Sequence, residues 1–172
     1  MTDTPDYDDD MLLVTVAGQD GARPRRTLSF SRAPTVLMTF AANRYTRTVS
    51  RIYQDRFGIG AMDWRMLVML TREPGSSVSH ASRIIGIDKA AVSRSLTQLE
   101  KRGLVRAETP GPDGRRRLFR LTEPGHAMHD ALLELALEQN RHLFAGFSAA
   151  DITTLAGLLS RFLTNLDASE ET

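Results

Sequence analysis

Along most of the chain, apolar residues recur at intervals of three and four positions, which is the pattern of amphipathic helices and predicts a mainly α fold. Pro34 suits the first turn of a helix, and Gly58, Gly86 and Gly103 suit helix ends. The pattern predicts helices over about 34–57, 62–72, 78–85, 88–102, 123–144 and 149–166.

Two of the shorter helices are predicted to form a helix-turn-helix. Ser77 and Asp88 belong to the residue types that cap helix N-termini, and each stands directly before a helical stretch. Gly86 suits the left-handed conformation that closes the first of these helices. Two short helices joined by Gly86 and Ile87 have the dimensions of a helix-turn-helix.

A β-hairpin is predicted directly after this pair of helices. Strand-like residues occupy about 104–109 and 116–121, and the turn sequence Pro110-Gly-Pro-Asp-Gly114 separates them. The expected fold class is therefore mainly α, a winged helix-turn-helix whose wing is this β-hairpin.

The terminal helices carry apolar stripes that need a partner, which predicts a homodimer. We therefore expect residues 34–60 and 123–168 to form a helical dimerisation domain, and residues 61–122 to form a winged helix-turn-helix DNA-binding lobe. Residues 1–33 are acidic, then apolar, then rich in Gly, Arg and Pro. They predict a partly flexible N-terminal arm with a short strand near 12–16.

Charge is distributed unevenly along the chain. Residues 1–10 and 167–172 hold eight of the 21 acidic residues and no base, so the rest carries a net charge of +9 although the whole carries +1. From Lys101 to Arg120 there are seven bases and two acids. A focused positive segment favours binding to a polyanion, and the alternative is a solvated surface with acidic tails.

Composition excludes several classes of protein. No apolar run reaches the roughly 18 residues of a membrane span. The short apolar stretch at 11–16 follows three aspartates instead of a basic segment, so a signal peptide is not expected. The absence of cysteine excludes disulfides, thiolate zinc sites and thiol redox switches. We expect a cytoplasmic protein that does not associate with membranes.

The helix predicted over 88–102 has a face that suits DNA, because it offers small groups, hydroxyls and cations without an acid. A helix in the major groove needs a slim edge and donors, and arginines on a hairpin tip can enter the minor groove. The alternatives are a solvated amphipathic helix and a protein-binding winged helix. The predicted DNA-contacting residues are Ser77, Lys89, Ala90, Ser93, Arg94, Thr97, Lys101, Arg115 and Arg116.

Three segments carry these features: Val78-Ser-His-Ala-Ser-Arg-Ile-Ile-Gly-Ile-Asp-Lys-Ala-Ala-Val-Ser-Arg-Ser-Leu-Thr-Gln-Leu-Glu-Lys-Arg-Gly-Leu-Val105, Asp113-Gly-Arg115 and Leu121-Thr-Glu-Pro-Gly125. In these segments the chain resembles the MarR family of winged helix-turn-helix regulators, and the resemblance extends over about 34–166. It implies a homodimer with interlocked first and last helices that binds a pseudo-palindromic site on double-stranded DNA. It also implies that Asp113 orients the wing, that Arg115 enters the minor groove, and that the groove-facing residues are Lys89, Ala90, Ser93 and Arg94.

Many members of this family repress transcription until a small molecule binds between their dimerisation and DNA-binding parts. The resemblance therefore implies a sequence-specific transcriptional repressor that an effector releases from its operator. The chain departs from the family in its long N-terminal arm, and its lack of cysteine is incompatible with the family's thiol-based peroxide sensors. A metal-responsive regulator and a regulator without any ligand are the alternatives.

Aromatic residues and arginines lie close together in the first two predicted helices, near the position of the family's effector cleft. Arginine pairs with carboxylate and phosphate groups, so the predicted effector is an aromatic acid or an aryl-CoA thioester. The alternative is that the aromatic residues belong to the core. The predicted effector-binding residues are Phe40, Arg44, Arg47, Tyr53, Trp64 and Arg65.

His126 and His129 lie one helical turn apart, a spacing that metal ligands also use. Only His80 and His142 accompany them, and no cysteine could complete a set of ligands. We interpret the pair as part of a solvated first turn beside Asp130, and we predict neither a metal nor a cofactor. An enzyme is not expected, since the chain has no Gly-x-Ser-x-Gly motif and no paired acid and base.

Overall fold

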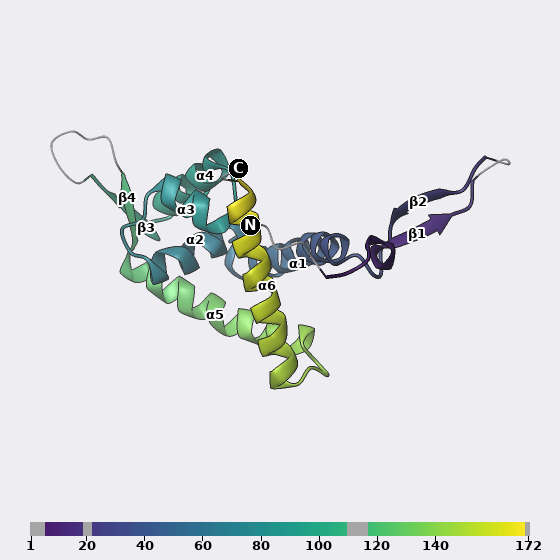
Figure 1. Cartoon of the computed structure of the whole chain (residues 1–172). Helices are drawn as coiled ribbons and strands as arrows, with labels where there is room; N and C mark the ends of the chain where they lie inside the picture. Colours follow the sequence, from purple (N-terminus) through teal and green to yellow (C-terminus); the bar gives the residue numbers. More distant parts are fainter. Residues whose placement is uncertain (1–5, 19–21, 110–116, 171–172) are drawn as a thin grey trace.

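The computed structural model describes residues 6–18, 22–109 and 117–170. Its elements follow the predicted order, a series of helices interrupted by the wing, with a hairpin before the first helix (Figure 1). The fold is therefore mainly α, as expected. The helices are α1 (Pro34–Phe57), α2 (Ala61–Arg72), α3 (Val78–Ile85), α4 (Lys89–Lys101), α5 (Glu123–Leu143) and α6 (Ala149–Glu170).

Helices α3 and α4 form the predicted helix-turn-helix. The Ser77 hydroxyl accepts a hydrogen bond from the backbone N–H of His80 at 3.2 Å, and the Asp88 carboxylate accepts one from the N–H of Ala91 at 2.9 Å. Gly86 lies between the helices with a φ of 68°, a conformation that glycine adopts without strain. These contacts confirm the predicted starts of both helices.

The wing consists of β3 (Val105–Glu108) and β4 (Leu118–Leu121), which pair antiparallel. Its base is tied to the segment between α2 and α3 through the buried residue Phe119. The N–H of Gly75 donates to the Phe119 carbonyl at 2.9 Å, and the Phe119 N–H donates to the Ser76 carbonyl at 3.0 Å. The turn predicted at 110–114 lies outside the described residues.

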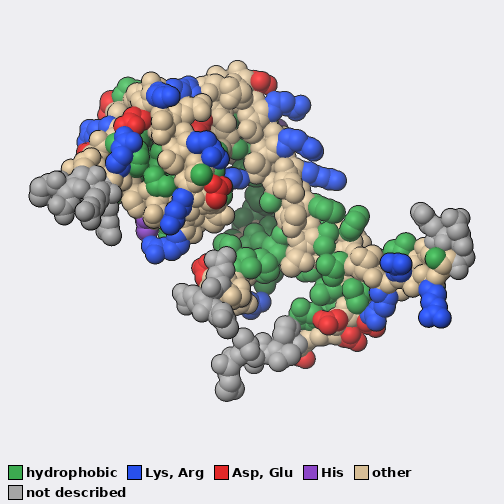
Figure 2. All heavy atoms as spheres, turned by 90° about the horizontal axis from the view of Figure 1, so that it is seen from above, with side chains coloured by type: hydrophobic (Ala, Val, Ile, Leu, Met, Phe, Trp, Pro, Cys, Tyr) green, Lys and Arg blue, Asp and Glu red, His purple; other side chains and the backbone are tan. Residues whose placement is uncertain are grey.

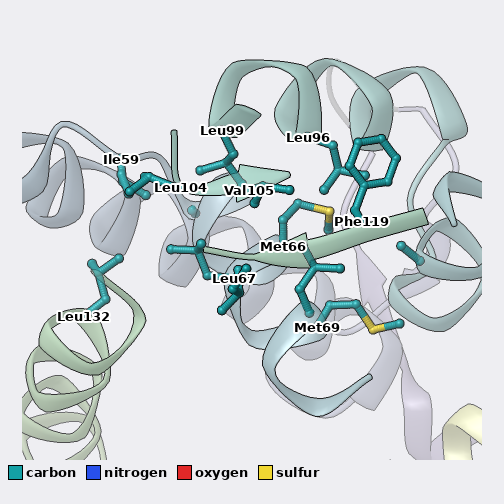
Figure 3. Close-up of a cluster of buried hydrophobic side chains, with 14 of the residues drawn as sticks. Ile59, Met66, Leu67, Met69, Leu96, Leu99, Leu104, Val105, Phe119 and Leu132 are labelled. Carbon is teal, nitrogen blue, oxygen red and sulfur yellow. The ribbon is translucent and has the colours of Figure 1, made fainter. Parts of the chain in front are cut away.

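The core lies where α2, α4, the wing strands and the first half of α5 meet (Figure 3). It also receives side chains from the second half of α1, so residues from the ranges 34–60, 61–122 and 123–168 pack together. Its largest fully buried side chains are Tyr53, Ile59, Met66, Leu67, Leu70, Val92, Leu96, Leu99 and Leu132.

The start of α5 packs tightly against the segment that follows α4. The Thr122 hydroxyl donates to the Gly103 carbonyl at 2.6 Å and accepts from the Gly125 N–H at 3.2 Å. A β-carbon at Gly125 would lie 1.9 Å from the Leu104 carbonyl oxygen. Any larger residue at position 125 would push α5 away from Leu104. Glycine therefore lets the start of α5 pack directly on the segment that leads into β3.

The N-terminal arm is a hairpin that stands away from the helical body, beyond the start of α1 (Figure 1). After a short 3-10 helix over Asp9–Leu12, β1 (Leu13–Val16) pairs antiparallel with β2 (Arg25–Leu28). This pairing confirms the strand expected near 12–16. The second strand is not evident in the sequence, because Arg25-Arg-Thr-Leu28 shows no alternation of apolar and polar residues.

Much apolar surface on the terminal helices is uncovered. In its described part, 149–169, α6 has no buried residue, and Leu37 and Phe40 in the first half of α1 are exposed as well. The sequence assigns this surface to dimerisation. None of the described helices is both long and apolar enough to cross a membrane. The exposed apolar residues of α6 are Ile152, Leu155, Leu158, Leu159, Leu163 and Leu166.

Candidate nucleic-acid interface

Helix α4 has one buried and one open face. Val92, Ser95, Leu96 and Leu99 are buried, and three of them are the apolar residues whose spacing predicted the helix. The residues of α4 that are predicted to contact DNA are all exposed, so α4 leaves their side chains accessible to a nucleic acid. They are Lys89, Ala90, Ser93, Arg94, Thr97 and Lys101.

A buried hydrogen bond holds α4 on α2. The Ser95 hydroxyl donates to the Asp63 carboxylate at 2.5 Å, and these residues are 5% and 7% exposed. A buried carboxylate needs a donor, which Ser95 supplies. Sequence reasoning missed this pair, because a serine on the apolar side of a helix resembles a small core residue and its partner lies 32 residues away.

Ser77 differs from the other predicted DNA-contacting residues, because it is half-buried and its oxygen caps α3. A hydroxyl that accepts one hydrogen bond can still donate another. A contact from Ser77 to a phosphate is therefore compatible with its capping role, and it stays a prediction.

Several bases around the wing are already paired with acids. Arg117 donates to both carboxylate oxygens of Glu100 at 2.7 and 2.8 Å. Arg106 and Arg120 both donate to Glu108, at 3.1 and 3.0 Å. The positive charge of these three arginines is therefore partly neutralised within the chain.

The two arginines beside Glu108 hold its carboxylate in the charged form. The hydrogen bond from Arg120 is the largest cause, Arg106 adds to it, and together they outweigh the opposing effect of burial. They lower the pKa of Glu108 below its ordinary value of 4.5.

Arg102 joins the end of α4 to the end of α1. Its guanidinium donates to the carbonyls of Gly58 at 2.6 Å and Phe57 at 3.1 Å. The sequence showed Arg102 as one of a run of bases, without a signal for this contact. Within the described residues, the bases without a hydrogen-bond or ion-pair partner on the open face of α4 are Lys89, Arg94 and Lys101.

The tip of the wing lies outside the described residues, so the roles expected for Asp113, Arg115 and Arg116 stay predictions. The described strand begins beside Arg117, whose guanidinium lies over the Phe119 ring, 5.2 Å from its centroid. Arg117 follows the predicted tip residues Arg115 and Arg116, and its guanidinium pairs with Glu100 in the last turn of α4.

A cleft of about 950 Å³ separates α1 from the turn of the helix-turn-helix at Gly86. Arg47 and Arg51 of α1 and Arg65 of α2 line it. The Arg65 guanidinium donates to the Thr46 hydroxyl at 2.9 Å, which holds it beside the cleft. The cleft can therefore present several guanidinium groups to an anion.

Three other residues predicted to bind an effector, Phe40, Arg44 and Trp64, line two separate hollows. A hollow of about 220 Å³ is lined by Phe40, Arg44 and Arg47, the last of which also borders the large cleft. Trp64 lies beside a separate cleft of about 390 Å³ between α2 and α3, which Arg65 also borders. Arg65 is thus common to the arginine-lined cleft and the cleft of Trp64.

Tyr53 lies in the core and not in a cleft, which agrees with the alternative interpretation that the aromatic residues belong to the core. Its side chain is fully buried, and its ring packs edge-to-face on Trp64 with centroids 6.1 Å apart. Burial, and to a smaller degree the nearby Tyr45, raise the pKa of Tyr53 to about 12. A ligand cannot reach Tyr53 in this structure.

His129 is buried, which corrects the expectation of a solvated histidine pair. Its ring stacks on Trp64 with centroids 5.4 Å apart, and its Nδ1 lies 2.9 Å from an Asp130 carboxylate oxygen. The apolar spacing of α5 carries His129 inward, whereas His126 is exposed. In the ranges that the structure describes, no group of three or more His, Asp or Glu side chains could hold a metal ion.

Known proteins share this sequence pattern. The family model of the MarR family matches residues 57–116, from the end of α1 into the wing. PetP of Rhodobacter capsulatus, an HTH-type transcriptional regulator, is 31% identical over 120 residues, which are 70% of each chain. YdgJ of Bacillus subtilis, also described as an HTH-type transcriptional regulator, is 29% identical over 113 residues, 66% of this chain and 69% of its own.

Solved structures share the fold. A MarR/EmrR family transcriptional regulator from Acinetobacter sp. ADP1 matches with a TM-score of 0.75 and 30% identity, over 82% of this chain and 99% of that one. The PcaV transcriptional regulator from Streptomyces coelicolor, solved in complex with its natural ligand, matches with a TM-score of 0.66 and 22% identity, over 80% and 96%. The second likeness concerns the fold alone.

Proposed function

This chain belongs to the MarR family of DNA-binding transcriptional regulators, and we propose that it is a repressor which a small anionic aromatic effector releases from its operator. Regulators of this family bind DNA as dimers. In the proposal, residues 34–60 and 123–168 form the dimerisation region and residues 61–122 the DNA-binding lobe. The operator is pseudo-palindromic, with half-sites about one helical turn apart.

The open face of α4 is the observation that carries the DNA-binding part of the proposal. Lys89, Arg94 and Lys101 are exposed and unpaired within the described residues, whereas Arg102 and Arg117 close to them are engaged inside the chain. Unpaired cations beside small side chains suit a helix that approaches phosphates and base edges. The expected contacts of Ser77, Ala90, Ser93 and Thr97 belong to the same surface.

The wing is tested with the full-length protein on DNA from upstream of its own gene. Arg115→Ala is expected to make binding to the operator weaker by about 1–3 kcal/mol, and to weaken discrimination between DNA sequences where the minor groove narrows. Arg56→Ala, on an exposed position of α1, is the control and should bind as the parent does. Unchanged duplex binding in both Arg115→Ala and Lys101→Ala would overturn the assignment.

The effector part of the proposal rests on the cleft lined by Arg47, Arg51 and Arg65. An aromatic acid or an aryl-CoA thioester supplies the anion for these guanidinium groups. The cleft adjoins the turn that precedes α4, so a ligand there can favour another position of this helix. A tenfold loss of DNA affinity corresponds to a coupling free energy of about 1.4 kcal/mol.

Thermal-shift screening of aromatic acids and their CoA thioesters tests this site. A compound that raises the unfolding temperature should release DNA, and it should change the fluorescence of Trp64, the single tryptophan, next to Arg65. Arg47→Ala should weaken its binding at least about tenfold, whereas Arg56→Ala should not. Stabilising compounds that leave operator affinity unchanged would contradict the proposal.

A further inference from the structure

The N-terminal hairpin is not accounted for by the likeness to the Acinetobacter regulator. The Acinetobacter regulator is matched over 99% of its length by 82% of this chain, and α1 to α6, Pro34–Glu170, account for about that share. The arm is therefore an addition to the shared fold, and its own contacts have to indicate its role.

The root of the arm is held in a defined direction. The Ser29 N–H donates to the Leu12 carbonyl at 2.8 Å, and the Arg32 guanidinium donates to the Leu13 carbonyl. The Phe30 ring packs edge-to-face on Phe40 of α1, with centroids 5.2 Å apart. The hairpin therefore leaves the helical body as a continuation of α1.

Beyond this root the hairpin has no cover. No residue of β1 or β2 is buried, and Phe30 is 70% exposed in spite of its contact with Phe40. An isolated two-stranded hairpin is marginally stable in water. A surface that covers the arm would stabilise it by burying its apolar side chains. The exposed apolar residues of this part are Met11, Val14, Val16, Leu28 and Phe30.

The apolar surface of the arm is continuous with the uncovered surface of the terminal helices. Figure 2 shows hydrophobic side chains gathered where the helical body gives way to the arm. Leu37 and Phe40, in the first half of α1, are both exposed. Because regulators of this family are dimers, a second copy of the chain is the molecule that would cover this surface and then meet the arm.

We propose that the hairpin is a dimer arm, which packs on the second copy of this chain and extends the apolar interface of the terminal helices. The proposal rests on the dimer stated under the proposed function. Val14 and Val16 lie on one face of the hairpin, whereas Leu28 lies on the other face together with its partner Leu13. Leu28 and Phe30 are the side chains that the second copy buries. Their combined burial slows dissociation of the dimer, since removal of apolar area from water favours association.

Duplex DNA is a less suitable partner for the arm. Arg25 and Arg26 lie in β2, but Arg26 is paired with Asp10, and further exposed aspartates precede it. Residues 1–33 hold six acids and four bases, and a net negative charge is repelled by phosphates. The apolar side chains of the arm would also gain nothing from a phosphate backbone.

Sedimentation equilibrium of full-length variants tests the arm. Leu28→Ser and Phe30→Ser should each raise the dimer Kd about tenfold or more, while the circular dichroism of the helices stays unchanged. Arg23→Ser is the control. It shortens an exposed side chain of the arm but removes no apolar side chain from β1 or β2, so the dimer Kd should stay unchanged. An unchanged Kd in both apolar variants would overturn the proposal that the hairpin packs on the second copy. A parent chain that is monomeric at micromolar concentration would overturn the dimer itself.

Cross-linking gives a second measurement that does not depend on affinity. The chain has no cysteine, so Thr15→Cys, on the same face of the hairpin as Leu28, offers a single thiol for a benzophenone label. In a mixture of isotopically light and heavy protein, the label should join light chains to heavy ones, with the attachment on α1, α5 or α6. Cross-links confined to the labelled chain, or formed only with added duplex DNA, would overturn the proposal.

Discussion

The hydroxyl of Ser95 donates a hydrogen bond to the carboxylate of Asp63 inside the core, and through this contact α4 is fixed on α2. Ser93 lies two positions earlier in the same helix and is exposed. The two serines therefore have opposite surroundings within one turn of helix. One positions the helix, and the other lies on the face that we propose to contact DNA.

We expect Ser95→Ala to lower the free energy of unfolding by about 1–3 kcal/mol, because the Asp63 carboxylate would stay buried without its donor. Urea denaturation of Ser95→Ala and of Ser93→Ala measures the change in the free energy of unfolding. Ser93→Ala is the matched control: its stability should equal that of the parent, while its affinity for the operator falls. Equal losses of stability in the two variants would contradict the buried role of Ser95.

Lys101→Ala should weaken binding to all duplex sequences alike. Lys101 is exposed and unpaired within the described residues, so we expect a phosphate contact without base readout. The slope of log affinity against log salt concentration should fall by about one unit. Fluorescence anisotropy at several salt concentrations measures the slope, with Arg141→Ala at the end of α5 as a control that keeps it. A loss confined to the operator would show that Lys101 reads bases.

Gly125→Ala should destabilise the protein by about 1–3 kcal/mol or more, because the added methyl group overlaps the Leu104 carbonyl oxygen and α5 must move. Thermal unfolding measures the loss. Gly157, in α6, has open space around the position of a β-carbon, so Gly157→Ala should not lower stability. A Gly125→Ala variant as stable as the parent would contradict the close contact.

The wing should respond to acid through Glu108. Since the pKa of this carboxyl is lowered in the folded protein, its contribution to stability is present above the ordinary value of 4.5 and is lost as the pH falls through the lowered value. A nuclear magnetic resonance titration of Glu108 measures the pKa directly. Arg120→Ala should raise it further than Arg106→Ala does, because the hydrogen bond from Arg120 is the largest cause. The reverse order would contradict this arrangement.

Local chemistry explains why much of the fold could be predicted. Caps act within three residues, so Ser77 and Asp88 announce the starts of α3 and α4 in the sequence itself. The spacing of Val92, Leu96 and Leu99 likewise indicated the buried side of α4, and with it the open face.

Contacts between distant segments could not be predicted in the same way. The bond between Arg102 and the carbonyls that end α1 joins residues more than forty positions apart, and in the sequence Arg102 is one base among several. Tyr53 and His129 were misplaced although the spacing within their own helices places them inward, four positions after Val49 and three before Leu132. Their ring contacts with Trp64 join different helices, and periodicity within one helix does not specify such contacts.

The hydrogen bonds from Arg102 to the carbonyls of Phe57 and Gly58 attach the C-terminal end of α1 to the end of α4, and leave the N-terminal end of α1 far from this attachment. The 24 residues of α1 span about 36 Å, so a tilt of about 5° around the attached end displaces the other end by about 3 Å. A shift of that size at the start of α1, where the arm is rooted, would reach the end of α4 through the hydrogen bonds of Arg102.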